Sequence, residues 1–166
     1  MPTHYRGTAR EVRALGAFIK LSRALDSLGA VLNQALVDQG VTPAQLAVLE
    51  ALLHLGPLST GELGRALLRS YPNVSLVVDN LEKGELVRRE RSQEDRRVVH
   101  ISLTAQGRRL IQRVFPGHAR RIADLMGALA ADEQEQLGRL CKKLGLAAQA
   151  ARSAASRGHA ARRNGR

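Results

Sequence analysis

Apolar residues recur at helical spacing near the start of the chain. They follow one another in steps of four and three, the pattern of one apolar face on an amphipathic helix. We therefore predict a long helix from about Ala9 to Asp38, ended by Gly40 and able to pack against another helix. The residues of this face are Ala14, Phe18, Leu21, Leu25, Leu28, Leu32 and Ala35.

Three shorter helices are predicted between Thr42 and Lys83. Thr42, followed by Pro43 at the first helical position, begins the first of them. Ser59 with Glu62 forms a capping box for the second, which ends near Leu68. A turn over residues 69–72 then leads to the third.

The third of these helices, from about Pro72 to Lys83, has one apolar and one polar face. Val74, Val77, Val78 and Leu81 lie at i, i+3, i+4 and i+7, so we expect them to be buried. The opposite face would be free to contact a partner. It carries Asn73, Ser75, Leu76, Asp79 and Asn80.

The segment that follows, Leu86 to Leu103, predicts a β-hairpin with a basic tip. Val99, Ile101 and Leu103 alternate with His100 and Ser102, which is typical of a half-buried strand. Cations at the tip of such a hairpin suit the backbone or the minor groove of DNA. Residues 42–103 therefore predict a winged helix-turn-helix DNA-binding domain. The candidate contact residues of the wing are Arg91, Asp95, Arg96 and Arg97.

Two more helices are predicted after the hairpin. Thr104 caps the first, in which Pro116 and Gly117 predict a kink, and Asp132 with Glu135 begins the second. The second has an apolar stripe of Leu137, Leu140, Cys141 and Leu144. A winged domain of about 60 residues cannot cover all these stripes, so we expect residues 9–38 and 104–146 to form a helical homodimerisation region.

The last segment, residues 147–166, is rich in Ala, Arg, Ser and Gly and holds five arginines and no acid. It has too few large apolar groups to fold alone, so we expect a flexible basic tail. The alternative that its Ala-rich part prolongs the preceding helix stays open.

Charge and composition limit the kinds of partner and cofactor that we expect. The 166 residues include 26 Lys and Arg against 15 Asp and Glu, a net charge of +11, which favours a nucleic-acid partner but also suits simple solubility. Cys141 has no second cysteine to pair with, and the five histidines show no ligand-like spacing, so we expect neither a metal nor another cofactor.

Other classes of protein are not favoured. No apolar run approaches the roughly 18 residues that span a bilayer, and the first residues lack the apolar stretch of a signal peptide, so we expect no membrane partner and a cytoplasmic location. The sequence shows no nucleophile with a base and no phosphate-binding glycine loop, so we do not expect an enzyme.

The segment from Asn73 to Gly107 carries four short motifs in succession, and with them it resembles the MarR family of bacterial transcription regulators. Helices on both sides fit too, so the resemblance covers roughly Arg10 to Gly145. The motifs are Asp79, Leu81, Glu82 and Lys83 at the end of the recognition helix, Leu86-Val87-x-Arg89, Asp95-Arg96-Arg97, and Leu103-Thr104-x-x-Gly107.

The resemblance implies a mainly α fold with a small β-hairpin wing and dimerisation helices at both ends. It implies a homodimeric repressor that binds an inverted repeat in double-stranded DNA and is released by a small-molecule effector. The effector crevice would be lined by Phe18, His54, Ser70 and Tyr71, although each is also an ordinary packing residue.

Base recognition should differ from that of relatives, because Leu76 and Asn80 stand where arginine is common and Ser75 where threonine is common. A nonspecific architectural DNA-binding protein is the alternative function. Such a protein would not need a recognition helix with a polar face, and a sequence-specific gain in affinity over random DNA separates the two.

Overall fold

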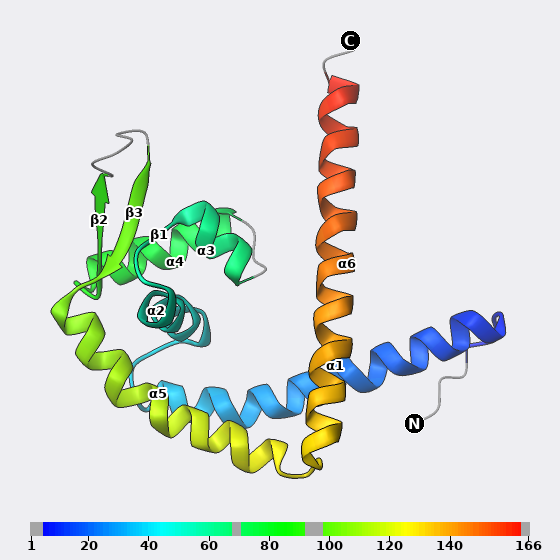
Figure 1. Cartoon of the computed structure of the whole chain (residues 1–166). Helices are drawn as coiled ribbons and strands as arrows, with labels where there is room; N and C mark the ends of the chain where they lie inside the picture. Colours follow the sequence, from blue (N-terminus) through cyan, green and yellow to red (C-terminus); the bar gives the residue numbers. More distant parts are fainter. Residues whose placement is uncertain (1–4, 68–70, 92–97, 164–166) are drawn as a thin grey trace.

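The computed structural model describes residues 5–67, 71–91 and 98–163. Figure 1 shows a base formed by two long helices, a winged domain standing on one side of that base, and a third long helix rising from it. The predicted fold class, mainly helical with a small β-wing, is confirmed. The elements are α1 (Ala9–Val37), α2 (Pro43–Leu55), β1 (Leu58–Ser59), α3 (Thr60–Ala66), α4 (Tyr71–Lys83), β2 (Val87–Arg91), β3 (Val99–Leu103), α5 (Ala105–Met126) and α6 (Ala131–Arg163).

Side-chain caps set the starts of the helices. Thr42 and Ser59 head the capping boxes of α2 and α3, as predicted, and Thr8 heads one for α1. Hydrogen bonds from the backbone N–H and hydroxyl of Ser59 lower the pKa of Glu62. The predicted cap of α6 is wrong, because Glu133, not Glu135, accepts the hydrogen bond from the backbone N–H at its start, that of Ala130.

The sheet has three antiparallel strands in the order β1-β3-β2. The predicted hairpin is present, with Val87 opposite Leu103 and Arg91 opposite Val99. Strand β1, in which Leu58 pairs with Ile101, was not predicted from the sequence. Two residues between a Gly-Pro break and a helix cap are too few to show an alternating pattern.

The predicted alternation along β3 fails at Val99 and at Ser102. Val99 is 38% exposed because it lies toward the wing tip, away from the core. Ser102, expected to face outward, is buried. Its hydroxyl accepts a hydrogen bond from Arg88 and donates one to Glu90, and these two side chains of β2 cover it.

The hydrophobic core lies inside the winged domain and against the first half of α5. One fully buried residue comes from each of α2, α3, α4, β3 and α5, namely Leu49, Leu63, Leu81, Ile101 and Ile111. Burying a side chain of this size contributes about 1.5–3 kcal/mol. On α4 the predicted apolar face is confirmed, since Val74, Val78 and Leu81 are buried and Val77 packs against the core.

The long helices outside the winged domain leave large apolar side chains exposed. On α1, Phe18 is 67% exposed and Leu25 60%, and on α6, Leu140 is 53% and Leu144 59% exposed. Cys141 on the same helix is also exposed. In the described part of the chain, no helix is both long and apolar enough to cross a membrane.

α6 continues much further than the predicted end of the sixth helix. Its backbone is helical through residues 147–163, the segment for which we expected a flexible tail and left a prolonged helix as the alternative. α5 contains Pro116 in its interior and is curved along its length (Figure 1), which agrees with the expected effect of a proline that lacks the N–H of an i to i−4 bond.

Candidate nucleic-acid interface

The outward face of α4 is polar except for one leucine. Because Val74, Val78 and Leu81 are buried in the core, the other side of the helix is presented to solvent. Asn73, Asn80 and Lys83 are exposed there, and Leu76 is 63% exposed. Such a face can offer amide groups to base edges and an apolar side chain to a thymine methyl group.

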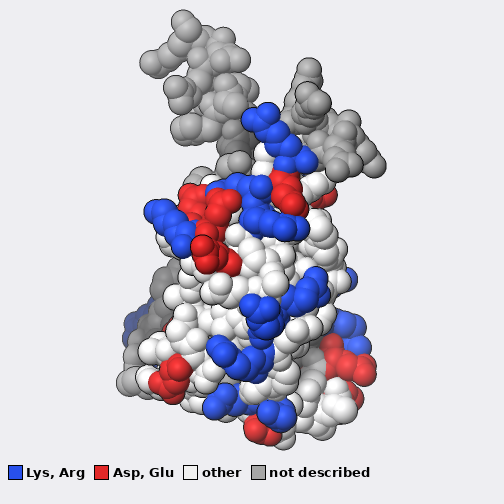
Figure 2. Space-filling model, turned by 90° about the vertical axis from the view of Figure 1, so that its left-hand side faces the viewer, with Lys and Arg blue, Asp and Glu red and all other residues white. Residues whose placement is uncertain are grey.

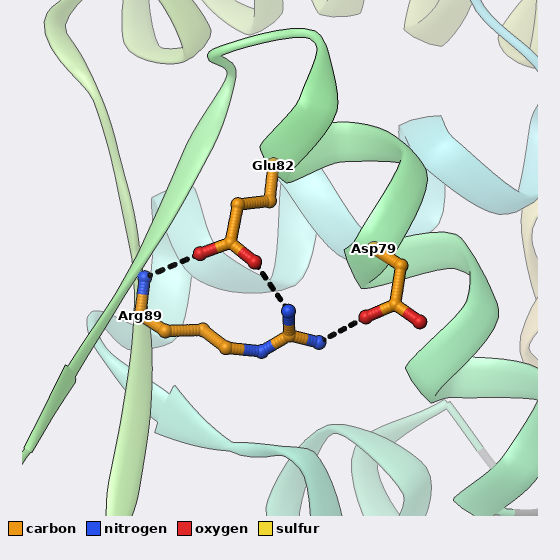
Figure 3. A network of polar contacts seen from close by, with 3 residues as sticks. All are labelled: Asp79, Glu82 and Arg89. Atoms are coloured by element: carbon orange, nitrogen blue, oxygen red, sulfur yellow. Dashed lines mark hydrogen bonds and ion pairs between the residues drawn. The ribbon is translucent and has the colours of Figure 1, made fainter.

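Two predicted contact residues of α4 are less accessible. Ser75 and Asp79 are half-buried. Figure 3 shows that Asp79 points toward Arg89 of β2, and Arg89 Nη2 donates a hydrogen bond to Asp79 Oδ1 over 2.5 Å. The carboxylate of Asp79 is therefore engaged within the protein.

Arg89 joins the recognition helix to the wing through two carboxylates. Its second terminal nitrogen donates to Glu82 Oε2, and its backbone N–H donates to Glu82 Oε1 over 3.2 Å (Figure 3). The hydrogen bond to Asp79, above all, raises the pKa of Arg89. Both carboxylates of α4 are thus paired with a cation rather than left facing the phosphates of a bound DNA.

A second junction ties the wing to the start of α5. The Thr104 hydroxyl donates a hydrogen bond to the carbonyl oxygen of Glu85 over 2.6 Å, and Gly107 N–H donates to that hydroxyl over 3.0 Å. A Cβ at Gly107 would lie 1.9 Å from the carbonyl oxygen of Leu86. The Thr104-x-x-Gly107 motif therefore lets α5 begin directly against the turn that precedes β2.

The described part of the wing is basic. Arg88 and Arg91 of β2 are exposed, and Arg88 is paired with Glu90 at 3.1 Å. Figure 2 shows basic side chains over the face formed by the wing strands and α5. The other predicted wing residues, Asp95, Arg96 and Arg97, lie outside the described residues.

Two adjoining pockets share His118 of α5 and Leu36 of α1 in their linings. One lies between α1 and α5, and the other lies where α1 and α2 meet His118. The second also has Glu50 and Asn33 in its lining, and the first has Arg113 and Arg121. The Nδ1 atom of His118 is buried and, among the described residues, has no hydrogen-bond partner.

The surroundings of His118 favour its neutral form. Burial lowers the pKa of the imidazole, with a smaller opposing contribution from Glu50 and a further lowering by Arg121. A neutral imidazole with one unpartnered nitrogen can accept or donate one hydrogen bond to a ligand, depending on its tautomer. Arg113 and Arg121 at the rim would favour a ligand that carries negative charge.

The residues predicted for an effector crevice lie elsewhere or are not described. Phe18 is exposed on α1, and the ring of His54 contacts that of Phe115 edge-on, with 5.5 Å between centroids. Neither lines the two pockets. Tyr71 is the first residue of α4, and Ser70 lies outside the described residues.

The contact between Arg89 and Glu82 and the pocket around His118 were not predicted from the sequence. Glu82 and Arg89 both stand in the family motifs. Whether a helix residue and a strand residue seven positions apart are in contact depends on the turn between them, which the motifs do not specify. His118 gave no signal, because its partners come from distant segments. Across the described ranges, no three His, Cys, Asp or Glu side chains gather where they could hold a metal ion.

Comparisons with known proteins identify the family. The MarR family model matches residues 39–98. The HTH-type transcriptional regulator MhqR of Bacillus subtilis is 35% identical over 134 residues, which are 81% of this chain and 92% of MhqR. The HTH-type transcriptional repressor MdtR of the same organism is 34% identical over 116 residues, 70% of this chain and 75% of MdtR.

A solved structure adds a ligand-responsive neighbour. Bordetella bronchiseptica BpsR, whose DNA binding is regulated by 6-hydroxynicotinic acid, superposes with a TM-score of 0.69 at 27% identity, over 78% of this chain and 98% of BpsR. The relatives are regulators rather than enzymes. The recognition helix, the braced wing and these matches together place the chain in the MarR family, as a DNA-binding transcriptional regulator and not an enzyme.

Proposed function

We propose that this protein is a homodimeric repressor that binds an inverted-repeat operator and is released by a small-molecule effector. The observation that carries the DNA-binding part is the geometry of α4 and β2. Arg89 holds the wing against the recognition helix while Asn73, Leu76 and Asn80 remain exposed on its outer face. The repressor role is supported by the similarity to MdtR. Action on bacterial DNA would place the protein in the cytoplasm.

The homodimer is supported by the exposed apolar residues of α1 and α6. Phe18, Leu25, Leu140 and Leu144 are each more than half exposed in the single chain. Large apolar side chains exposed along two helices favour an interface with another chain. In a two-fold dimer the two recognition helices would meet half-sites about one helical turn apart, hence an inverted repeat.

Within each half-site we assign three kinds of contact. Asn73, Ser75, Leu76 and Asn80 would contact base edges in the major groove. Arg91, Arg96 and Arg97 of the wing would contact the backbone or minor groove, with Asp95 bracing the loop. Asp79 was a candidate base contact, but its bond to Arg89 supports a positioning role instead.

Selection of bound sequences from a random DNA pool tests this proposal. The affinity for the selected sequence is then compared with that for scrambled DNA at one salt concentration. An inverted repeat bound roughly 10³-fold more tightly is the expected result. Equal affinity for all sequences would instead support a nonspecific architectural protein.

We further infer that the effector is a small organic anion bound beside His118. Arg113 and Arg121 supply positive charge, and Nδ1 of His118 lacks a partner among the described residues. The regulation of BpsR by 6-hydroxynicotinic acid, an aromatic carboxylic acid, supports this class of ligand. The crevice of Phe18, His54, Ser70 and Tyr71 is the competing location.

The two locations are separable by paired variants. A panel of small aromatic carboxylates, beginning with 6-hydroxynicotinic acid, is screened for release of the operator by the wild-type protein. The His118→Ala variant should lose the response to an active compound and the His54→Ala variant should keep it. The reverse result would move the effector to the competing crevice, and no release by any compound would count against this ligand class.

A further inference from the structure

The part of the chain that follows Glu135 in α6 is basic. After Glu135 the sequence contains no Asp or Glu. Arg139 pairs with Glu135 at 3.5 Å, and Arg139, Lys142, Lys143 and Arg152 are all exposed. The cations after Glu135 are Arg139, Lys142, Lys143, Arg152, Arg157, Arg162, Arg163 and Arg166.

The two halves of α6 have different compositions. The first half holds Leu137, Leu140, Leu144 and Leu146, the apolar residues that a dimer would cover. From residue 147 onward no apolar side chain is larger than that of alanine. Dimerisation therefore explains the first half of the helix but not the second, which offers a partner charge rather than apolar surface.

The direction of α6 brings its basic half to the side of the DNA-binding surface. α2 packs against α5 on one side and against α4 on another. Figure 1 shows α4 and the wing on the side of α2 away from the base. Figure 1 shows α6 rising from the base on this same side, in the direction of β2 and β3, and extending beyond the level that these strands reach. A helix of 33 residues is about 50 Å long, enough to pass the full height of the winged domain.

We propose that residues 147–163 of α6 form an accessory DNA-binding element that contacts phosphates between the two half-sites. The inference rests on the proposed function, because it uses the two-fold dimer to bring both copies of α6 between the two winged domains. DNA is the partner that the placement favours over an acidic protein, since the helix ends on the same side as α4 and the wing. Phosphate neutralisation would also offset the repulsion between the two basic helices.

The test is the salt dependence of operator binding by a triple variant, Arg157→Ala, Arg162→Ala and Arg163→Ala. Alanine has the highest helix propensity, so these changes preserve the helix while they remove its charge. A second triple variant, Arg10→Ala, Arg13→Ala and Lys20→Ala, removes the same charge from exposed positions of α1 and serves as the matched control. Circular dichroism and light scattering check that each variant is folded and dimeric.

The α6 variant should show a shallower plot of log affinity against log salt, by roughly 0.9 for each phosphate that the helix no longer neutralises. Hydroxyl-radical protection at the centre of the operator should weaken, and the α1 control should match the wild type in both respects. This inference is overturned if the α6 variant keeps the wild-type salt dependence of affinity and the wild-type protection at the centre of the operator. If that variant still selects the operator over random DNA, the proposed function stands. Equal affinity of the wild type for all sequences overturns the proposed function itself, and with it the placement between half-sites.

Discussion

Arg89 and Asp79 hold the wing and the recognition helix in one fixed relation. The guanidinium on β2 meets the carboxylate on α4 over 2.5 Å, and Glu82 one turn later accepts from the other terminal nitrogen of Arg89. The Arg89 side chain is 30% exposed, and those of Asp79 and Glu82 are 45% and 40% exposed. The network is thus partly screened by solvent, and its main contribution is geometric rather than a large gain in stability.

Replacing Arg89 with alanine should weaken DNA binding on every sequence. Two unpaired carboxylates would then face the phosphates and the wing would lose its anchor, while the free energy of unfolding should fall by only about 1–2 kcal/mol. Binding to operator and random DNA and denaturant unfolding measure the two effects. A double-mutant cycle with Asp79→Asn isolates the pair, and additive effects would show that the two side chains do not act together.

Gly107→Ala should strongly destabilise the fold. The new Cβ would lie 1.9 Å from the Leu86 carbonyl oxygen, so the start of α5 or the turn before the wing must move. We expect a loss of about 2 kcal/mol or more in unfolding free energy. Gly61→Ala is the control, because at that position a Cβ meets only the end of the Arg65 side chain at 3.9 Å, and it should be neutral or stabilising by up to about 1 kcal/mol. Similar stabilities for both variants would contradict the close approach.

Replacing Asn80 and replacing Arg91 should have different effects on the affinities for operator DNA and for random DNA. Asn80→Ala should lower affinity for the selected operator by about 1–3 kcal/mol and leave affinity for random DNA unchanged, since a base contact carries sequence information. Arg91→Ala should weaken both equally, because a phosphate contact is the same on every sequence. Competition assays with the two DNAs measure this split. If Asn80→Ala weakened both DNAs equally, Asn80 would be a backbone contact.

His118 should make the protein less stable in mild acid. Its pKa in the folded protein lies below its ordinary value of 6.5, so the unfolded chain binds more protons in that window and stability falls as pH drops below about 6.5 toward the lowered pKa. Above that window the imidazole is neutral in both states and the effect vanishes. The wild type should therefore lose more stability than His118→Gln between pH 7.5 and pH 5.5 in denaturant titrations. Parallel losses in the two proteins would show that another group titrates.

A charge placed in the apolar stripe of α6 should break the proposed dimer. Leu140→Glu would bury an unpaired carboxylate at each copy of the interface, which costs several kcal/mol unless the chains separate. Light scattering should report a monomer for this variant. Lys143→Glu, at an exposed neighbouring position, should remain a dimer. A dimeric Leu140→Glu variant would place the interface elsewhere.

The amino-acid sequence by itself determined the helices, the wing and the family. Periodic apolar residues and local caps, such as Thr42 with Gln45 and Ser59 with Glu62, act within a few residues of each other, so their effect is readable along the chain. The buried face of α4 followed from the same local rule.

Only the tertiary structure decided which side chains meet across elements. Arg89 reaches Asp79 and Glu82 because a turn through Glu85, with a positive φ of 56°, folds β2 back along α4. The pocket at His118 forms where α1, α2 and α5 converge, and the direction of α6 depends on the turn after α5. Contacts between residues far apart in the sequence depend on the packing of whole elements, which no local pattern encodes.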